Sequence, residues 1–279
     1  MTSQVIAPAP AVTYRRGMAV PAQRSAGELL REWRERRRLS QMDLALEADV
    51  STRHLSFVET GRSAPSRDMV LRLAEHLDVP LRERNHLLLA AGFAPVYGER
   101  GIDTPEMAPV REALRRLLAG HEPYPALVVD RHWNLVDGNR GIALLTAAAA
   151  PALLRPPVNA LRLALHPDGM APQVLNLGEW RAHLLGRLRR QVALTADDRL
   201  GELLAELEGY PGEEAHVEPG HAAGEVVVAL RLRHGDGELA FLSTVATFGT
   251  PLDVMVAELA IESFFPADAA TAAALREAA

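Results

Sequence analysis

The chain has 279 residues and a formal net charge of −6, and its length favours two domains over one. It contains no cysteine, which excludes disulfides, thiol redox sensing and cysteine-ligated zinc or iron–sulfur centres. No stretch approaches the roughly 18 consecutive apolar residues of a membrane-spanning helix. The charge is uneven, with +3 on residues 1–100 and −9 on residues 101–279. Because the acidic part repels a polyanion, contact with nucleic acid is expected only in the N-terminal part.

Two segments lack the apolar periodicity of regular structure. Residues 1–23 contain three prolines among alanines and lack the continuous apolar core of a signal peptide. Residues 98–109 are rich in proline, glycine and charged side chains, as linkers are. We therefore expect a disordered arm at 1–23, a helical domain at 24–97, a linker at 98–109 and a second domain at 110–279. With no signal peptide and no membrane span, a cytoplasmic location is expected.

Residues 24–97 carry the pattern of five short helices. The first, expected over 25–38, has an apolar stripe made by Leu29, Leu30 and Trp33. Serine caps, glycine ends and one proline predict where the other four helices begin and end. These markers are Ser40, Ser51, Gly61, Ser66, Pro80 and Gly92. Connections of only a few residues then make a compact all-α domain.

The segment from Leu29 to Phe93 resembles the Xre/Cro-type helix-turn-helix, the fold of phage repressors. The resemblance is carried by Arg34, Leu39-Ser40-Gln41, Leu44-Ala45, Val50-Ser51, Leu55-Ser56, Glu59-Thr60-Gly61-Arg62, Pro65-Ser66 and Leu71 to Ala74. In that family the second helix of the motif lies in the DNA major groove, with its N-terminal residues on the base edges. Asp49 stands where the family usually has glycine, and aspartate tolerates the left-handed conformation that this turn needs.

The resemblance implies roles for residues in and around the second and third helices. Base contacts are expected from Gln41, Thr52, Arg53, His54 and Phe57, the last against a thymine methyl group. Phosphate contacts are expected from Ser40, Thr60, Arg62, Ser63, Ser66 and Arg67. Arg34 and Glu59 match a family ion pair that fixes the third helix against the first. The alternative is a helical bundle whose polar residues only face solvent, but it does not explain why caps, turn and apolar spacing agree.

Residues 110–279 mix helical and strand patterns. Helices are expected over 110–118, 141–150, 159–165, 176–192 and 197–208, with Asn139 as the cap of the second. Strands are expected over 126–130, 133–137, 226–232, 239–248 and 259–265, with a hairpin turn at Gly235-Asp236-Gly237. This order of elements predicts an α+β domain, in which helices cover one face of an antiparallel sheet.

The run from Ala126 to Asn139 is similar to the opening of PAS domains, and the whole chain resembles the MmyB-like regulators. The resemblance is carried by Pro125 to Leu127, Asp130 to Asn134, Asn139, Asn159 to Leu163, His166 to Gly169, Thr247 to Pro251 and Phe264 to Pro266. It implies a PAS-like domain that holds a small, mostly apolar effector, fatty-acid-like in some members, between sheet and helices. The expected pocket residues are Trp133, His166, Phe241, Phe248 and Phe264, for which plain core packing is the alternative.

Catalytic and metal-binding motifs are missing from the sequence. There is no phosphate-binding loop, no Gly-x-Ser-x-Gly elbow and no His-Glu-x-x-His zinc helix. Glu179 with His183, and His216 with His221, have spacings that two-residue matches reach by chance. We therefore expect no enzyme, no metal site and no cofactor.

These patterns together predict a transcriptional regulator that binds double-stranded DNA. One helix-turn-helix head covers few bases, so a homodimer on a palindromic operator is expected. The C-terminal sheet and the helix over 176–192 are both candidate dimer surfaces. Two roles stay open for the C-terminal domain: it binds an effector that changes the affinity for DNA, or it only dimerises a constitutive DNA binder. Stabilisation of the protein by an apolar small molecule would separate them.

Overall fold

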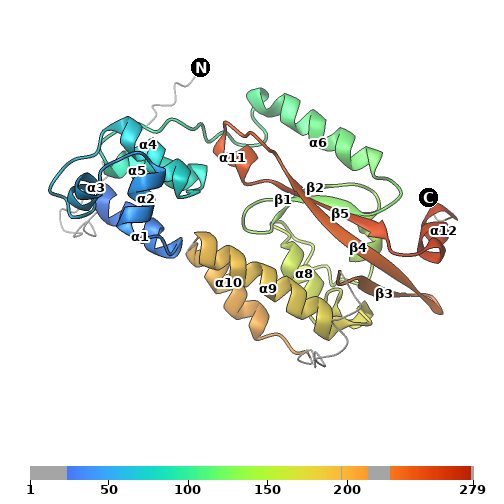
Figure 1. The fold of residues 1–279 in the computed structure, drawn as a ribbon. Coiled ribbons are helices and arrows are strands. Elements are labelled where there is room, and N and C mark those ends of the chain that lie inside the picture. The colour runs from blue at the N-terminus through green and yellow to red at the C-terminus, as the bar shows by residue number, and fades with distance from the viewer. Residues whose placement is uncertain (1–23, 196, 213–226, 278–279) are drawn as a thin grey trace, which may run out of the picture.

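The structure, a computed structural model, describes residues 24–195, 197–212 and 227–277 (Figure 1). The expected arm at 1–23 and the pair His216 and His221 lie outside the described residues. A helical region is followed by an antiparallel sheet flanked by helices, so the chain is α+β as predicted. Among the described residues, no helix is both long enough and apolar enough to span a bilayer.

Five helices form the N-terminal region, as the sequence pattern predicts. They are α1 (Ala26–Arg36), α2 (Gln41–Glu47), α3 (Thr52–Glu59), α4 (Arg67–His76) and α5 (Leu81–Ala90). The side chains of Ser40, Ser51 and Ser66 each accept a hydrogen bond from a backbone N–H in the first turn of the helix that follows. The predicted caps are confirmed, and each satisfies a donor that the helix itself leaves unpaired.

Left-handed residues close the turns around α3. Asp49, between α2 and α3, has a φ of 52°, and Gly61, after α3, has a φ of 71°. The conformation expected of each is therefore confirmed, and Asp49 replaces the usual glycine as one of the residues that tolerate it best. Leu30, Leu44 and Leu55 are fully buried in one core. This core packs one face of α3 inward and leaves its first residues at the surface.

Five antiparallel strands form one sheet in the order β2-β1-β5-β4-β3. The strands are β1 (Ala126–Val129), β2 (Leu135–Gly138), β3 (Leu230–His234), β4 (Gly237–Thr247) and β5 (Ala260–Pro266). The strand expected over 226–232 is shorter than predicted, since β3 begins at Leu230; Val226 lies outside the described residues. The predicted hairpin between β3 and β4 is present, and Gly235 takes a φ of 56° in its turn.

Helices pack on both faces of the sheet (Figure 1). The remaining helices are α6 (Ala108–Gly120), α7 (Ile142–Thr146), α8 (Ala160–Leu165), α9 (Leu177–Thr195), α10 (Asp198–Glu208), α11 (Val254–Ala257) and α12 (Ala269–Glu277), with short 3-10 helices at Pro105–Met107 and Ala171–Gln173. α8, α9 and α10 share one core with the sheet. On the other face, Leu114 and Leu118 of α6 pack with Val128 and Ile261. The prediction of helices over one face is therefore wrong, because β1 is buried along its whole length and needs cover on both sides.

Asn139 does not cap a helix, which corrects the prediction. Its Oδ1 accepts a hydrogen bond from the Ala126 N–H at 3.0 Å. Its Nδ2 donates to the carbonyls of Leu118 at 3.1 Å and Tyr124 at 2.8 Å. α7 begins three residues later without a side-chain cap. The buried amide instead ties the end of α6 to the start of β1.

The C-terminal helix α12 was not predicted. Its alanine-rich sequence offers few large apolar residues from which a stripe could be recognised. The Thr271 hydroxyl accepts a hydrogen bond from the Ala240 N–H at 3.0 Å, which docks the helix on β4. Tertiary contact therefore fixes this helix more than its periodicity does.

Candidate DNA interface and effector cavity

The N-terminal end of α3 presents three of the residues expected to read bases. Ser51 accepts a hydrogen bond from the His54 N–H at 3.2 Å and so caps the helix. Thr52 and Arg53 are exposed and His54 is partly exposed, whereas Leu55 is buried. The exposed side chains lie at the end of the helix that carries the positive macrodipole, which suits an approach to DNA.

Phe57 lies between two arginines on this surface. The guanidinium carbon of Arg53 is 5.4 Å from the Phe57 ring centroid, and that of Arg62 is 5.9 Å from it. Neither guanidinium has an acidic partner within the part of the chain that the structure describes. The aromatic ring thus holds two cations at the surface through cation–π contacts. Such a pair suits a partner with closely spaced negative charges.

The predicted structural pair of Arg34 and Glu59 is a buried ion pair with a third member. Arg34 donates from Nε to Glu59 Oε1 at 2.7 Å and from Nη2 to Oε2 at 2.9 Å. Gln41 donates from Nε2 to Glu59 Oε2 at 2.7 Å. This contact was missed by sequence reasoning, which treated Gln41 only as a base reader. The three side chains join α1, α2 and α3, so they set the angle at which α3 leaves the core.

The residues expected to contact phosphates surround α3. Ser40, Thr60, Arg62, Ser66 and Arg67 are exposed, and Ser63 is partly exposed. The Ser40 hydroxyl already donates to the Asp43 carboxylate at 2.7 Å. The Thr60 hydroxyl donates to the Ser56 carbonyl, also at 2.7 Å. The Ser40 and Thr60 hydroxyls are therefore already hydrogen-bonded at helix ends. Arg62 and Arg67 supply the positive charge that this surface offers to a phosphate.

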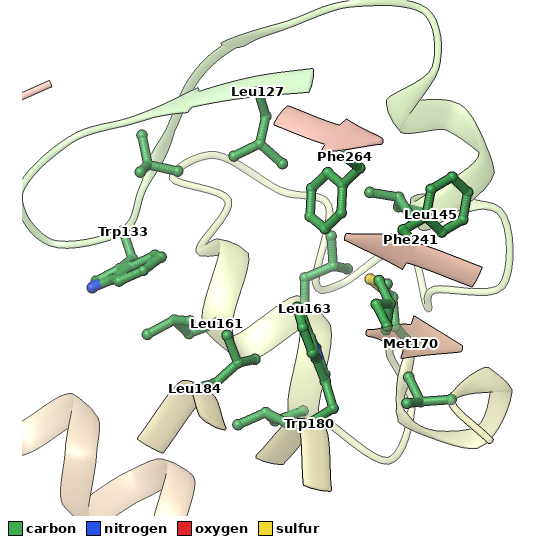
Figure 2. Packing of buried hydrophobic residues seen from close by; sticks show 14 of the residues in the cluster. Leu127, Trp133, Leu145, Leu161, Leu163, Met170, Trp180, Leu184, Phe241 and Phe264 are labelled. Carbon is green, nitrogen blue, oxygen red and sulfur yellow. The ribbon is translucent and has the colours of Figure 1, made fainter. Parts of the chain in front are cut away.

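An apolar cavity lies between the sheet and the helices of the C-terminal region. It is lined by Leu127, Trp133, Leu135, Ile142, Leu145, Thr146, Val158, Ala160, Leu161, Leu163, Ala164, Met170, Trp180, Leu184, Leu230, Glu262 and Phe264. The space between these side chains is about 630 Å³, part of it open to solvent, and about 60 Å³ admits the centre of a water molecule. Figure 2 shows side chains from β1, β5, α8 and α9 converging on this region. The cavity has room for a few waters as it stands and for a small ligand once its lining moves.

Two of the five predicted pocket residues, Trp133 and Phe264, line the cavity. Phe241 belongs to the same core, with its ring centroid 6.3 Å from that of Phe264, but it is not part of the lining. His166 packs edge-on against Tyr210, and Phe248 lies with the α6 cluster on the opposite face of the sheet. Most of the lining is aliphatic. Sequence reasoning missed it because a leucine in a cavity wall has the same pattern as a leucine in a core.

One charged residue, Glu262, lines the cavity and was also missed. Strand alternation places it on the same face of β5 as Phe264, and it pairs in register with Leu127 of β1. Its Oε1 accepts a hydrogen bond from Arg187 Nη1 at 3.2 Å. Burial raises the pKa of Glu262, and the nearby Arg187 acts against that rise. The signal that could have found it is an acidic residue at an inward position of an alternating strand.

Trp133 holds a left-handed backbone conformation at the edge of the cavity, with a φ of 67°. This conformation is rare for a bulky residue and stores strain. The indole Nε1 donates to Gln191 Oε1 at 2.8 Å, and the guanidinium carbon of Arg187 lies 4.4 Å from the ring centroid. Gln191 donates in turn to the Arg131 carbonyl at 2.9 Å. The cavity wall is thus bonded both to α9 and to the turn between β1 and β2.

Ion pairs connect that turn to the helical region. Arg131 lies 3.3 Å from Glu258 and 3.0 Å from Asp197, measured between the nitrogen and oxygen atoms. Glu258 also accepts two hydrogen bonds from Arg82 of α5, at 2.8 and 2.9 Å. Arg82 pairs with Glu99 as well. A continuous set of side-chain contacts therefore runs from Trp133, beside the cavity, to α5 of the N-terminal helical region.

The described part of the chain builds no group of three metal-ligating side chains. The His183 ring stacks on Trp180 with their centroids 5.4 Å apart. Glu179 accepts a hydrogen bond from Asn176 at 3.1 Å. The Glu179 and His183 spacing is thus explained by packing and by a contact at the start of α9.

Comparison with protein families gives two matches. Residues 25–87 match the helix-turn-helix domain family, and residues 110–278, more than half of the chain, match the family described as MmyB-like transcription regulator ligand binding domain. No curated protein matches the chain. Both matched domains are those of transcription regulators and neither is an enzyme family. The chain therefore belongs to the MmyB-like transcription regulators, with a DNA-binding helix-turn-helix ahead of a ligand-binding domain.

Proposed function

We propose that the protein is a sequence-specific regulator whose affinity for its operator changes when a small, mostly apolar molecule fills the cavity. In this proposal residues 24–97 form the DNA-binding domain, 98–109 the linker and 110–279 the effector domain. The protein acts in the cytoplasm, as a homodimer on a palindromic site. The single observation that carries the proposal is an apolar cavity joined by side-chain contacts to the helices that present a DNA-binding surface.

The assignment of DNA contacts follows the exposure and charge of the surface around α3. Thr52, Arg53 and His54 are the proposed base readers, because they are accessible at the leading end of the helix. Gln41 and Phe57 stay candidate base readers. Gln41 also bonds to Glu59, and Phe57 also holds Arg53 and Arg62 in place. The proposed phosphate contacts are Ser40, Thr60, Arg62, Ser63, Ser66 and Arg67. Of these, the arginines contribute most of the salt-dependent affinity.

The effector acts on α5 through Trp133 in this proposal. A ligand in the cavity touches the indole, whose Nε1 is held by Gln191. A shift of that ring changes the position of Arg131, since Gln191 also donates to the Arg131 carbonyl. Arg131 and Arg82 share the carboxylate of Glu258. Effector binding can therefore alter the placement of the helical domain, provided the two placements differ in affinity for the ligand.

The alternative is a constitutive DNA binder whose C-terminal domain only dimerises the chain. The apolar stripe of α9, including Leu184 and Leu188, is buried within the protomer. Of the two dimer surfaces considered, this leaves the sheet, and since helices cover both of its faces the proposed contact is at its edge strands β2 and β3. The presence of an apolar cavity with a buried charged group favours the effector-responsive form, because a purely structural core would be filled more completely.

The test begins with selection of an operator from random duplexes by the full-length protein, with and without a total lipid extract. Thermal unfolding is then measured with the same extract. A ligand at a hundred times its dissociation constant should add about 2.7 kcal/mol to the free energy of unfolding. The matched variant Ala164→Leu, which reduces the space in the cavity, should lose this stabilisation, and its operator affinity should no longer respond to the extract. Equal DNA affinity and equal stability with and without the extract would favour the constitutive alternative.

A further inference from the structure

We propose that the cavity selects an effector whose head group is uncharged and both donates and accepts hydrogen bonds, as an alcohol or primary amide does, over the carboxylate of the same chain length. This inference rests on the proposed function, since it names the chemical class of the effector. It is carried by the ion pair between Glu262, which lines the cavity, and Arg187, which lies behind it. The residues that surround this pair decide which head groups it accepts.

Glu262 is the only charged residue among the described residues that line the cavity. It is 5% exposed, and its register partner Leu127 lies beside it in the lining. On the other side of β5 its register partner is Val245, which is 42% exposed. The carboxylate therefore lies at the boundary between the enclosed part of the sheet face and the exposed end of β4. This is the expected position for the polar end of an amphipathic ligand whose apolar chain lies farther inside.

Arg187 completes a pair with no net charge. Its Nη1 is 3.2 Å from Glu262 Oε1, and its guanidinium rests on the Trp133 ring. The Arg187 side chain is 22% exposed, so it reaches the pair from the solvent side. The stacked ring restricts where the guanidinium can go. A ligand head group that reaches Glu262 comes next to the guanidinium bonded to that carboxylate, and the Ser243 side chain is a further hydrogen-bond partner of Glu262. Both charged groups still have hydrogen-bonding positions to offer.

Charge balance then selects among head groups. A carboxylate would add a second negative charge beside the buried Glu262, and like charges repel most strongly where water is excluded. An ammonium group would leave the positive charge of Arg187 uncompensated. An alcohol or primary amide can donate to Glu262 and accept from Arg187 without changing the net charge. Every buried polar group then keeps a partner, which is the condition for burying it at low cost.

The length of the cavity wall limits the apolar part of the ligand. Trp180 and Leu184 of α9 line the cavity, and Arg187 follows on the same helix. Arg187 lies seven positions after Trp180, which corresponds to about 10 Å along a helix axis. An extended eight-carbon chain is of similar length. Eight-carbon compounds are therefore suitable probes for this wall.

The experiment compares 1-octanol, octanamide and octanoate on the full-length protein, with dissociation constants from calorimetry at pH 8, where octanoate is ionised. Octanamide and octanol should bind at least about ten-fold more tightly than octanoate, a ratio equivalent to about 1.4 kcal/mol. In Glu262→Gln, the negative charge is removed without a change in shape. Octanoate should then bind more tightly than it does to the wild type. The ratio of its dissociation constant to that of octanamide should fall from about ten-fold to near one. In Ala164→Leu, all three should bind more weakly, because that residue also lines the cavity.

The outcomes separate the two proposals. Octanoate binding to the wild type as tightly as octanamide overturns this inference and leaves the proposed function standing. If the ratio is the same in Glu262→Gln and in the wild type, Glu262 does not cause the preference. That result also overturns this inference. If none of the three probes binds, the proposed function itself is contradicted. The wild-type ratio is decisive by itself, so the inference stays testable even if the Glu262→Gln protein does not fold.

Discussion

Arg82 of α5 and Glu258, just before β5, form a two-pronged ion pair that joins the helical region to the sheet. Arg82 donates from Nε to Glu258 Oε1 at 2.8 Å and from Nη2 to Oε2 at 2.9 Å. Both side chains are mostly buried. Arg131, from the turn beside the cavity, shares the same carboxylate. Paired guanidinium and carboxylate groups of this geometry fix orientation as well as distance.

We predict that Arg82→Ala uncouples effector binding from DNA binding. Each ligand should still bind the variant when offered alone. Coupling between two sites is typically about 1–3 kcal/mol, and at least about half of it should be lost when the shared carboxylate loses one partner. Operator affinity is measured by fluorescence anisotropy with and without the effector. Arg116→Ala is a matched control, because its pair with Glu112 lies exposed on α6. If effector binding changes operator affinity equally in Arg82→Ala and in the wild type, the pair of Arg82 and Glu258 does not couple the two sites.

Replacement of Arg53 by alanine should relax base preference at one operator position. The side chain is exposed at the leading end of α3, where it can reach a guanine edge. The loss should be about 1–3 kcal/mol on the selected operator and little on duplexes altered at that base pair. Competition titrations with single-base operator variants measure this. A loss of equal size on every duplex would show that Arg53 contacts only the backbone.

Replacement of Arg62 by alanine should weaken binding to all duplexes alike. Arg62 is exposed beside Phe57 and follows the end of α3, where phosphates are expected. Loss of one phosphate contact should reduce the slope of log affinity against log salt by about 1. Binding is measured over a range of salt concentrations. Arg31→Ala provides the control, since Arg31 pairs with Glu35 on the surface of α1; a similar change of slope there would contradict the assignment.

Replacement of Arg34 by alanine should destabilise the helical domain strongly. The change leaves the carboxylate of Glu59, whose side chain is 1% exposed, without its cation. Removing one partner of a buried ion pair costs about 3–5 kcal/mol. Chemical denaturation followed by circular dichroism gives the free energy of unfolding. The double variant Arg34→Met with Glu59→Leu should recover much of the loss, because no unpaired charge is then buried; a double variant as unstable as Arg34→Ala would argue against this cause.

Glu206 should contribute stability that depends on pH. Arg162 donates two hydrogen bonds to it, at 2.8 and 2.7 Å, and Tyr210 donates a third at 2.6 Å. The bonds from Arg162 in particular hold the pKa of Glu206 below its ordinary value of 4.5. The unfolded chain therefore takes up the proton first as the pH falls. The stabilisation is present above pH 4.5 and is lost as the pH falls through the lowered pKa.

The measurement for Glu206 is the difference in unfolding free energy between wild type and Glu206→Gln across the acidic range. That difference should be at most about 1 kcal/mol near neutral pH, because the pair is partly solvated. It should vanish in acid. Glu112→Gln is the control, since that carboxylate lies in an exposed pair on α6. A difference between wild type and Glu206→Gln that persists at the lowest pH would assign the effect to packing.

The helix-turn-helix could be predicted from the sequence because its determinants are local. Ser40 and Ser51 cap helices within three residues, and Asp49 adopts the left-handed conformation by its own tolerance of it. In the C-terminal region, the hairpin at Gly235 was predictable for the same reason. Asn139 was misread because its three hydrogen-bond partners come from segments as far as 21 residues away. A side chain that can cap a helix can also form hydrogen bonds with buried backbone groups elsewhere. Which of the two it does depends on the tertiary fold.

The sequence by itself determined that a serine-capped helix belongs to a helix-turn-helix and that an α+β domain follows it. Tertiary structure alone decided that Glu262 meets Arg187, 75 residues away, at the edge of an apolar cavity. It also decided that Arg82 meets Glu258 across 176 residues. The physical reason is that helix caps and turns act within a few residues, whereas the charge balance of a buried site depends on which distant strands and helices pack around it.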